Sequence, residues 1–438
     1  MTNRSLSRRP FPPGANFGML GSADRRFRMI TRFDNERLTR VTGDAPMGRL
    51  MREHYWIPFA RSEAIAAGAK PQRIRLLGEN YVAFRGEDGQ VGLLDEHCPH
   101  RRASLLLARI EDCSLRCIYH GWRMDRTGRV LEVPSEGSRS AAFAARVKTN
   151  HYEVLEGGGL VWAFLGKGKA PPAPPMPFMA RPEGSRWWTR TVVGCNWLQG
   201  FEGALDSYHL NWLHLGWPVG GRRDVVPPDP PRYEIEPTDY GMRTAAVRKP
   251  DEATVHFRVA EFVAPFYALV AGRQPAIPTD CSVFISVPVD DKNHLLFFGY
   301  WDEVGRLELD EKNFPSTLDP NDLVPDGGNW ENGWHQDRDA MAEGHFSGFT
   351  RSVLDEDVSV QLSMGPIVDR SLENIASTDL AIVRMRRHLL ALLDRFESGV
   401  PVDGALHAYA RGGHLPFAKV APAGSDWRQS GARDPVSA

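Results

Sequence analysis

The sequence is poor in cysteine, lacks any long apolar run and carries almost no net charge. Only 5 of its 438 residues are cysteine, an odd number, so a disulfide framework is not expected. No stretch approaches the ~20 apolar residues that a membrane-spanning helix requires. The N-terminal MTNRSLSRRPFPPG also lacks the apolar core of a signal peptide. We therefore expect a cytoplasmic protein.

The charge balance limits the choice of partners. Lys and Arg number 53 against 55 for Asp and Glu, so no basic field exists to attract nucleic acid or an anionic membrane. No G-x-G-x-x-G pattern occurs in a strand-turn-helix context, which argues against a nucleotide site of the chain's own. With 42% hydrophobic residues, the chain is typical of a globular protein of two or three domains that acts on a small molecule.

The first part of the chain predicts an all-β domain behind a short leader. Residues 1–50 form an arm rich in Arg, Pro and Gly followed by a leading helix, with order beginning near Asn35. Residues 51–166 alternate apolar and polar positions and are interrupted by turn residues at 86–89 and 127–128. That pattern predicts β-hairpins, the last strand being GLVWAFLG.

The second part predicts a larger domain of mixed structure. Residues 167–178 are a proline-rich, stiff linker, and 179–438 alternate strand-like text with two helical segments. The helices are expected at about 197–214 and 378–396, the latter beginning at an N-cap Ser377 or Thr378. The fold class is therefore α+β, with an antiparallel sheet that grips helices.

Four residues of the first domain have the spacing of a metal site: Cys98, His100, Cys117 and His120. They form C-x-H and C-x-x-H, separated by sixteen residues. Two thiolates on one iron and two imidazoles on the other suit a [2Fe–2S] cluster with a raised reduction potential. The same ligand types also suit a tetrahedral zinc site, so ligand identity alone leaves both open.

The flanking residues separate these two interpretations. The ligands lie in CPHRRASL and CIYHGW, and the stretch from His54 to Glu136 resembles the Rieske domain of ring-hydroxylating oxygenases. Arg102 stands where many Rieske proteins have Gly, and this form is similar to the phthalate-dioxygenase branch. Cys113, Cys195 and Cys281 have no place in the family pattern and are expected to be buried apolar residues.

A second candidate site lies in NWLQGFEGALDSYHLNWLH. If this segment is helical, Glu202, Asp206 and His209 fall at i, i+4 and i+7 on one face. His214 lies about 140° away from His209, so both imidazoles reach one ion only where the helix ends or bulges. The spacing by itself is equally compatible with two hydrogen-bonded core histidines.

The resemblance supplies a role for this segment. E-G-x-x-D-x-x-H-x-x-x-x-H is similar to the mononuclear iron motif of the same oxygenases, which implies that His209 and His214 are iron ligands. Two histidines and one carboxylate leave part of the iron open for dioxygen and substrate. LDEDVSVQLSMG resembles the segment that supplies the third ligand, at Asp357, with Asp355 and Glu356 as local competitors.

The resemblance also implies an assembly. In the family, the aspartate at Asp206 links the Rieske histidine of one subunit, here His120, to an iron-ligand histidine of the next, here His209. Asp206 is thus expected to act in electron transfer across a subunit interface. A homo-oligomer follows, either a trimer or a hexamer.

The substrate and the reaction are inferred from the same resemblance. Arg258 matches a carboxylate-binding position, although pairing with Glu261 is an alternative, and Ser207 follows the bridging aspartate. We expect a terminal oxygenase that cis-dihydroxylates a phthalate-like or benzoate-like acid with O2. Its electrons come from NADH through a separate flavin and [2Fe–2S] reductase, with or without a ferredoxin.

Three alternatives stay open on the sequence. Monooxygenation or O-demethylation of a methoxylated or phenoxy acid would use the same ligands, because the outcome depends on where the substrate carbon lies. A Rieske electron carrier would hold two irons and not three. A zinc-stapled regulator that binds aromatic ligands would be colourless.

Overall fold

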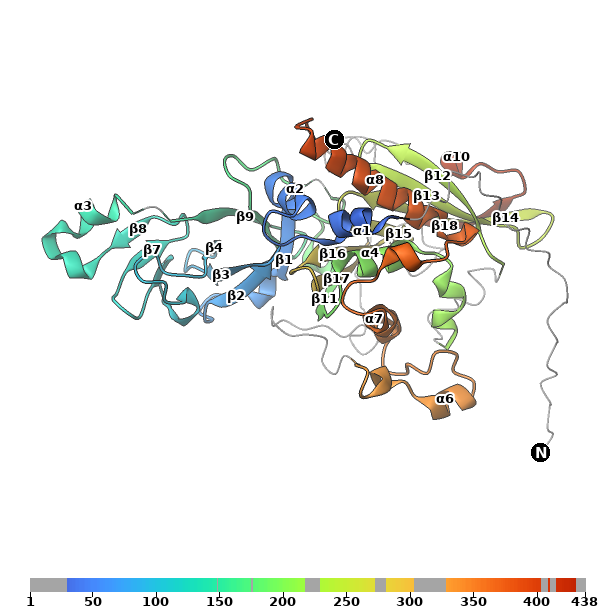
Figure 1. Ribbon diagram of the computed structural model, residues 1–438, viewed down its shortest axis with the longest axis horizontal. Helices are drawn as coiled ribbons and strands as arrows, with labels where there is room; N and C mark the ends of the chain where they lie inside the picture. The colour runs from blue at the N-terminus through green and yellow to red at the C-terminus, as the bar shows by residue number, and fades with distance from the viewer. Residues whose placement is uncertain are drawn as a thin grey trace.

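The protein is elongated, with a small β domain at one end and a larger sheet covered by helices at the other (Figure 1). The computed structural model describes residues 30–147, 149–174, 176–216, 229–271, 281–302, 328–402, 409 and 415–430. No helix within these ranges is long and apolar enough to cross a membrane. Most of the arm expected within residues 1–50 lies outside the described residues.

The leading segment forms two helices, α1 (Arg32–Thr39) and α2 (Pro46–His54), where one was expected. Gly43, with φ at +59°, and a proline at the first position of α2 separate them, because neither residue favours a continuous helix. Both helices pack against α8 (Leu380–Glu397) of the second domain. The leader therefore packs on the larger domain, and α2 also contacts strands of the first domain.

The first domain is all-β, as predicted. A six-stranded antiparallel sheet has the order β1 (Trp56–Arg61), β10 (Leu160–Phe164), β9 (His151–Gly157), β4 (Val91–Asp95), β3 (Glu79–Arg85) and β2 (Gln72–Leu76). A smaller sheet contains β5 (Arg109–Glu111), β6 (Ser114–Arg116), β7 (Arg123–Asp125) and β8 (Val130–Glu132). Both predicted hairpin turns are confirmed, and Gly89 and Gly128 take the positive φ that such turns require.

The second domain is built on one eight-stranded antiparallel sheet. Its order is β11 (Arg186–Val193), β17 (His294–Trp301), β16 (Cys281–Pro288), β15 (Tyr267–Ala271), β14 (Thr254–Val263), β13 (Gly241–Arg248) and β12 (Arg232–Thr238), and β18 (Phe417–Pro422) pairs with β14. Helix α4 (Trp197–Leu205) packs on β15, β16 and β17, and α8 packs on β12 and β13. This arrangement confirms the expected sheet that grips helices.

Four other α-helices lie within the described residues. They are α3 (Ser140–Ala144), α6 (Arg338–Ala342), α7 (Val353–Ser363) and α10 (Trp427–Ser430). Of these, α7 packs against α4 and so brings a late segment of the chain beside residues from its middle. This contact between α7 and α4 positions residues of the candidate site.

The proline-rich segment 167–178 lies against both domains. The Trp56 indole donates a hydrogen bond to the carbonyl oxygen of Pro171 at 2.9 Å. Phe178 is fully buried; it stacks on Trp162 of the first domain, with ring centroids 6.3 Å apart, and meets Trp188 of the second domain edge-on at 5.0 Å. The segment is therefore held by packing as well as by the stiffness of its prolines.

The two domains share one hydrophobic core. Trp162 of the first domain stacks on Tyr267 of the second at 6.3 Å, and the Tyr267 hydroxyl donates to the carbonyl oxygen of Trp56. A backbone hydrogen bond of 2.8 Å also joins Gly78 to Val289. A continuous apolar core of this kind favours a fixed relative orientation of the domains.

The helix predicted over about 197–214 is shorter than expected. Helix α4 ends at Leu205, and Asp206 takes an extended conformation with φ −74° and ψ 122°. Two 3-10 turns follow, at His209–Asn211 and Leu213–Gly216. The placement of three acidic and imidazole residues on one helical face was therefore wrong, whereas the break needed to bring both histidines together is present.

The other predicted helix is confirmed with a different start. Helix α8 spans Leu380–Glu397, and a 3-10 turn at Ser377–Asp379 precedes it. Asp379 accepts a hydrogen bond from the Ala376 amide at 2.7 Å, so neither Ser377 nor Thr378 is the N-cap. A carboxylate near the start of a helix is stabilised by the positive end of the helix dipole, which explains why Asp379 takes this position.

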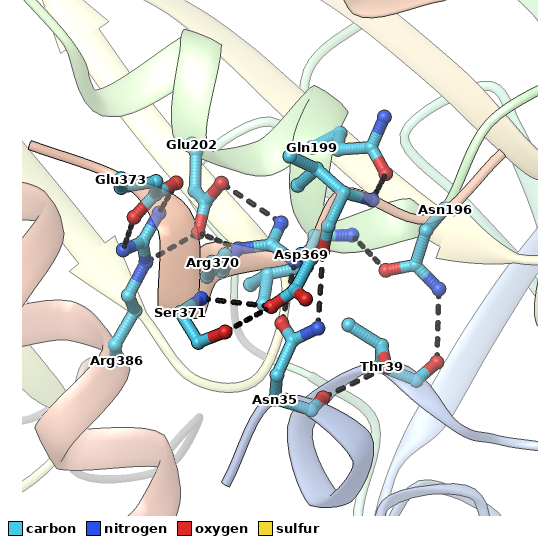
Figure 2. A network of polar contacts seen from close by, with 12 residues as sticks. Asn35, Thr39, Asn196, Gln199, Glu202, Asp369, Arg370, Ser371, Glu373 and Arg386 are labelled. Carbon is cyan, nitrogen blue, oxygen red and sulfur yellow. Dashed lines mark hydrogen bonds and ion pairs between the residues drawn. The ribbon is translucent and has the colours of Figure 1, made fainter. Parts of the chain in front are cut away.

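The last turn of α4 is anchored by a buried cluster of charges (Figure 2). Glu202 accepts two hydrogen bonds from Arg370, at 2.8 and 2.9 Å, and one from Arg386 at 2.6 Å. Arg370 also donates to Asn35 of α1, and Arg386 pairs with Glu373. Burial raises the pKa of Glu202, but the two guanidinium groups outweigh this effect and lower it. The cluster joins α4 to three other segments, which are α1, residues 370–373 and α8.

Removing one member of this cluster should destabilise the protein. We expect Arg370→Met to lower the free energy of unfolding by about 3–5 kcal/mol, because a buried carboxylate loses its main partner. The matched control is Arg129→Met, whose side chain is 74% exposed and pairs only with Asp125, with an expected loss of about 0–1 kcal/mol. Urea unfolding measures both, and equal losses would contradict the prediction.

Candidate metal centres and substrate cavity

Two loops of the first domain bring the first set of predicted ligands together. Cys98 and Cys117 are buried, with 1% and 3% exposure, and His100 and His120 face each other with ring centroids 4.5 Å apart. Burial first, then the neighbouring thiol, raises the pKa of Cys98 to about 11. Metal ions would be needed to hold such a thiol as thiolate. The four residues thus form a thiol pair and an imidazole pair.

The imidazole pair is prepared for ligation. His100 stacks on Trp122 at 4.8 Å with an interplanar angle of 6°, which fixes the orientation of its ring. Among the described residues its buried Nδ1 atom has no hydrogen-bond partner. A buried ring nitrogen of this kind calls for a ligand. These observations fit a [2Fe–2S] cluster held by the four predicted residues.

Backbone geometry shapes both loops. The Cys98 amide donates to Ala103 and the Cys117 amide to Trp122, each at 2.8 Å. Arg102 has φ at +62°, a left-handed conformation that favours glycine. The position where many Rieske proteins carry Gly therefore requires that conformation, and Arg102 adopts it at a cost of about 1–2 kcal/mol.

The second set of predicted ligands meets in the larger domain. His209, His214 and Asp357 each offer a ligand atom, and all three atoms lie within 4.8 Å of one another. Asp357 Oδ1 is 3.7 Å from His209 Nε2 and 3.3 Å from His214 Nε2. Two imidazoles and one carboxylate are the donor set of non-haem Fe(II) sites. Within the described residues this is the one cluster of three or more such groups within 4.8 Å.

Carboxylates orient both imidazoles from behind. Fully buried Glu356 forms a hydrogen bond with His214 Nδ1, and its other oxygen accepts one from Ser347. Burial lowers the pKa of His214, but Asp357 and Glu356 outweigh it and raise the pKa to about 9. On metal binding a divalent ion would replace that proton. Glu356, considered only as a competing ligand in the sequence, is thus positioned as a supporting residue.

Asp206 supports the second imidazole. Its Oδ2 lies 3.6 Å from His209 Nδ1, and its carboxylate accepts hydrogen bonds from the Tyr208 and His209 amides. Burial raises the pKa of Asp206, but these contacts with His209 and the backbone outweigh it and lower the pKa. A carboxylate that binds the amides two and three residues ahead also competes with helix formation, which explains why α4 ends here.

The local competitors point elsewhere. Asp355, in the first turn of α7, pairs at 3.0 Å with Arg351, which precedes the helix. Glu202 faces Arg370 and Arg386, as described above, and is not among the residues that approach the triad. The geometry therefore favours Asp357 as the third ligand, and its role as such stays a prediction.

A cavity opens beside the triad. Its walls come from α4, α7 and strands β14 to β17, and most of the residues are apolar or aromatic. They include Leu210, Val270, Ala271, Phe284, Leu296, Phe298, Tyr300, Val353 and Leu354. Such a lining is typical of a site for a small aromatic molecule.

Arg258 is the single basic side chain among the described residues that line this cavity, histidines excepted. Glu261, the alternative partner, instead accepts hydrogen bonds from Tyr240 at 2.5 Å and Arg243 at 3.0 Å. Because Arg258 and Glu261 lie three residues apart on strand β14, they face opposite sides of the sheet. Arg258 therefore borders the cavity, and its role as a carboxylate-binding residue stays a prediction.

Ser207 occupies a different place from the one expected. It is buried, its amide donates to the Tyr233 hydroxyl at 2.9 Å, and it is not among the residues that line the cavity. Its role as a substrate contact stays a prediction. Phe284, Phe298 and Tyr300, which line the cavity, had no local signal in the sequence, because strand pairing alone brings them there.

A second, more open groove lies on the other side of the triad. It has about 1020 Å³ of empty space and is lined by Asp206, His209 and Asp357 together with acidic residues that include Glu373 and Asp379. Asp206, His209, Asp357, Gly203 and Gln361 border both hollows. The candidate metal site is therefore reachable from two directions.

Comparison with known proteins agrees with this geometry. Residues 55–151 match the family described as Rieske [2Fe-2S] domain, and residues 163–438 match the family described as LigXa C-terminal domain like. The chain is 37% identical to the phthalate 4,5-dioxygenase oxygenase subunit of Pseudomonas putida, across 92% of this chain and 95% of that protein. It is 36% identical to the 3-chlorobenzoate-3,4-dioxygenase oxygenase subunit of Comamonas testosteroni, across 83% and 89%.

A further relative and a solved structure complete the comparison. The 5,5'-dehydrodivanillate O-demethylase oxygenase subunit of Sphingobium sp. (strain NBRC 103272 / SYK-6) is 30% identical, across 85% of this chain and 82% of that protein. The terminal oxygenase of carbazole 1,9a-dioxygenase from Novosphingobium sp. KA1 has the same fold, with a TM-score of 0.56 and 18% identity, covering 82% and 94%. The chain therefore belongs to the Rieske non-haem iron oxygenases, as an oxygenase subunit of the type that carries a Rieske [2Fe–2S] cluster and a mononuclear catalytic iron.

Proposed function

We propose that this protein cis-dihydroxylates an aromatic carboxylate, using O2 and electrons from NADH that arrive through a separate reductase. One observation carries the proposal: the apolar cavity beside the His209, His214 and Asp357 triad contains Arg258 in its wall. A guanidinium in an apolar cavity suits a carboxylate, while the apolar walls suit an aromatic ring. The relatives named for phthalate and 3-chlorobenzoate are consistent with this substrate class.

The residues around the two metal sites would have separate roles in this reaction. When bound, the cluster would supply electrons one at a time and the mononuclear iron would activate dioxygen. Arg258 would hold the carboxylate at one end of the cavity, and the aromatic walls would direct the ring toward the triad and exclude water. Glu356 and Asp206 would hold His214 and His209 in their ligating orientation.

O-demethylation of a methoxylated aromatic acid is the second candidate. The O-demethylase relative at 30% identity favours it, and the described cavity offers the same acid-binding arginine for such a substrate. Which reaction occurs depends on whether a ring edge or a methyl group lies beside the iron. The measurement of products separates these candidates.

We also propose that electrons pass between subunits of a homo-oligomer, a trimer or a hexamer. The cluster loops expose the apolar Leu107, Ile118 and Tyr119, beside the basic Arg101 and Arg109. A charged and apolar surface of this kind is complementary to the acidic groove beside the triad. Such complementarity supports docking of one copy's cluster loops near another copy's Asp206.

The groove supplies the opposite half of this contact. It contains Asp206, Glu373 and Asp379, and Val360 and Met364 on its rim are 37% and 48% exposed. Within one chain, the cluster loops belong to the first domain and the triad to the second, and these domains lie at opposite ends of the long axis (Figure 1). A ring of copies, each placing its cluster loops into a neighbour's groove, would bring His120 near Asp206.

Product analysis tests the proposed reaction. We expect iron-replete protein, supplied with NADH and a surrogate reductase, to convert a member of a panel of phthalates, benzoates, phenoxybenzoates and methoxybenzoates. Mass spectrometry should show a gain of two oxygens and two hydrogens on a ring acid. Loss of a methylene or gain of one oxygen would instead establish the O-demethylase or monooxygenase reaction.

The variant Arg258→Gln is the control for substrate class. Loss of a charged hydrogen bond costs about 1.5–3 kcal/mol, so KM for the acid should rise by about 10- to 100-fold. The iron content and the KM for an uncharged aromatic analogue should change little. An unchanged KM for the acid would mean that Arg258 does not bind the carboxylate.

The assignment of Asp357 is tested by iron content. We expect Asp357→Ala to lower iron from about three to about two per chain, because one of three protein ligands is lost while the cluster ligands are intact. Asp355→Ala, which removes only the pair with Arg351, should keep all the iron. The visible spectrum of the cluster should be unchanged in both variants. Loss of iron in Asp355→Ala alone would mean that Asp355, and not Asp357, is the third ligand.

The proposed assembly is tested by sedimentation. We expect a trimer or a hexamer, and Ile118→Asp, at a position that is 60% exposed, should shift it toward smaller species and slow product formation. Val420→Asp, on β18 and 58% exposed, is the matched control and should leave assembly intact. A wild-type monomer with full activity would contradict the proposal.

A further inference from the structure

Strands β13 and β14 place three basic side chains behind the substrate cavity. Arg248 ends β13 and pairs in register with His256 of β14, and Arg258 follows two residues later on the same face. Arg248 and His256 are each only 2% exposed, whereas Arg258 lines the cavity. The row therefore leads from the cavity into the interior of the domain.

Arg248 holds the loop that carries two of the candidate ligands. Its guanidinium donates to the Ser207 carbonyl oxygen at 3.3 Å and to Asn211 Oδ1 at 3.0 Å. These two residues lie on either side of His209 in the chain. A third hydrogen bond, of 3.1 Å, reaches the carbonyl oxygen of Asp229. The rigid, planar guanidinium of Arg248 thus sets the position of the turn between Asp206 and His214.

His256 lies between the two guanidinium groups as a neutral ring. Burial lowers its pKa most, and Arg248 and Arg258 lower it further, to about 4. Its Nδ1 and Nε2 atoms, and the Nη1 atom of Arg248, are buried and have no hydrogen-bond partner among the described residues. An unmade hydrogen bond on a buried polar group is destabilising. A rearrangement that lets the imidazole accept from Arg248 would remove this destabilisation, but it draws positive charge onto a ring that the charge of Arg258 also faces.

We propose that Arg248 is a positioning residue that, through His256, links occupation of Arg258 by the substrate carboxylate to the placement of Asp206 and His209. The inference rests on the proposed function in taking Arg258 as the carboxylate site. A carboxylate there cancels one of the two positive charges that face His256. The imidazole and Arg248 can then pair, which shifts the hydrogen bonds that hold the 207–211 turn.

The consequence is that electrons are used productively only when an acid occupies the cavity. Asp206 and His209 border both the cavity and the acidic groove, so a small shift of their turn is felt on both sides. A displacement of about 1 Å in a catalytic group lowers rates by about 100-fold. Substrate binding on one side of the site would thereby set the geometry on the other.

Two variants of equal burial test the proposal. Arg248→Met removes all three hydrogen bonds, and Arg243→Met is the control, since Arg243 is also 2% exposed on β13 but contacts Glu261 and Trp427. We expect Arg248→Met to lower product formed per NADH consumed several-fold, with the dissociation constant of the acid little changed. Arg243→Met should keep the wild-type ratio.

A spectroscopic readout separates this proposal from the proposed function. In the wild type and in Arg243→Met, the acid should change the EPR spectrum of the Fe(II)–nitric oxide complex, and in Arg248→Met it should not. If Arg248→Met fails to fold, Asn211→Leu removes one acceptor and should weaken the same response. Absence of any product in the wild type would overturn the proposed function alone. A spectral response and product ratio in Arg248→Met equal to those of Arg243→Met would overturn the present inference.

Discussion

The end of helix α4 at Leu205 is the constraint on which the candidate iron site depends. A continued helix would carry His209 and His214 to different faces. Because Asp206 instead accepts hydrogen bonds from the amides of Tyr208 and His209, the chain leaves the helix and forms two short turns. Both imidazoles then face Asp357. The residue that would conduct electrons is thus also the residue that stops the helix.

Anchoring of that helix end is the second requirement. Glu202, one turn earlier, is held by Arg370 and Arg386, and these arginines come from segments more than 160 residues later in the chain. On the opposite side, α7 packs against α4 and delivers Asp357 and Glu356 from one helical turn. The positions of the candidate ligands are well defined because α4, α7 and the segments that carry the two arginines converge on the short loop with His209 and His214 and fix both of its ends.

Much of this could be predicted from local patterns. The hairpins at 86–89 and 127–128 follow from turn chemistry, and the helix near 380–397 follows from its apolar spacing. The spacing of Cys98, His100, Cys117 and His120 indicates a metal site before any fold is known, since two loops with those ligand types have few other uses. The errors fell at positions where a polar side chain competes with regular structure, at Asp206 and at Asp379.

The sequence by itself determined the domain order, the ligand types and the need for a break between His209 and His214, because these depend on residue spacing of only a few positions. Only the tertiary structure decided the roles of residues that are distant in the chain. It turned Asp355 toward Arg351, placed Glu356 behind His214 and left Arg258 facing the cavity while Glu261 took other partners. It also assembled the cavity from four strands and two helices. Strand pairing and helix packing join residues far apart in the chain, and no local pattern specifies which of several neighbouring side chains will meet.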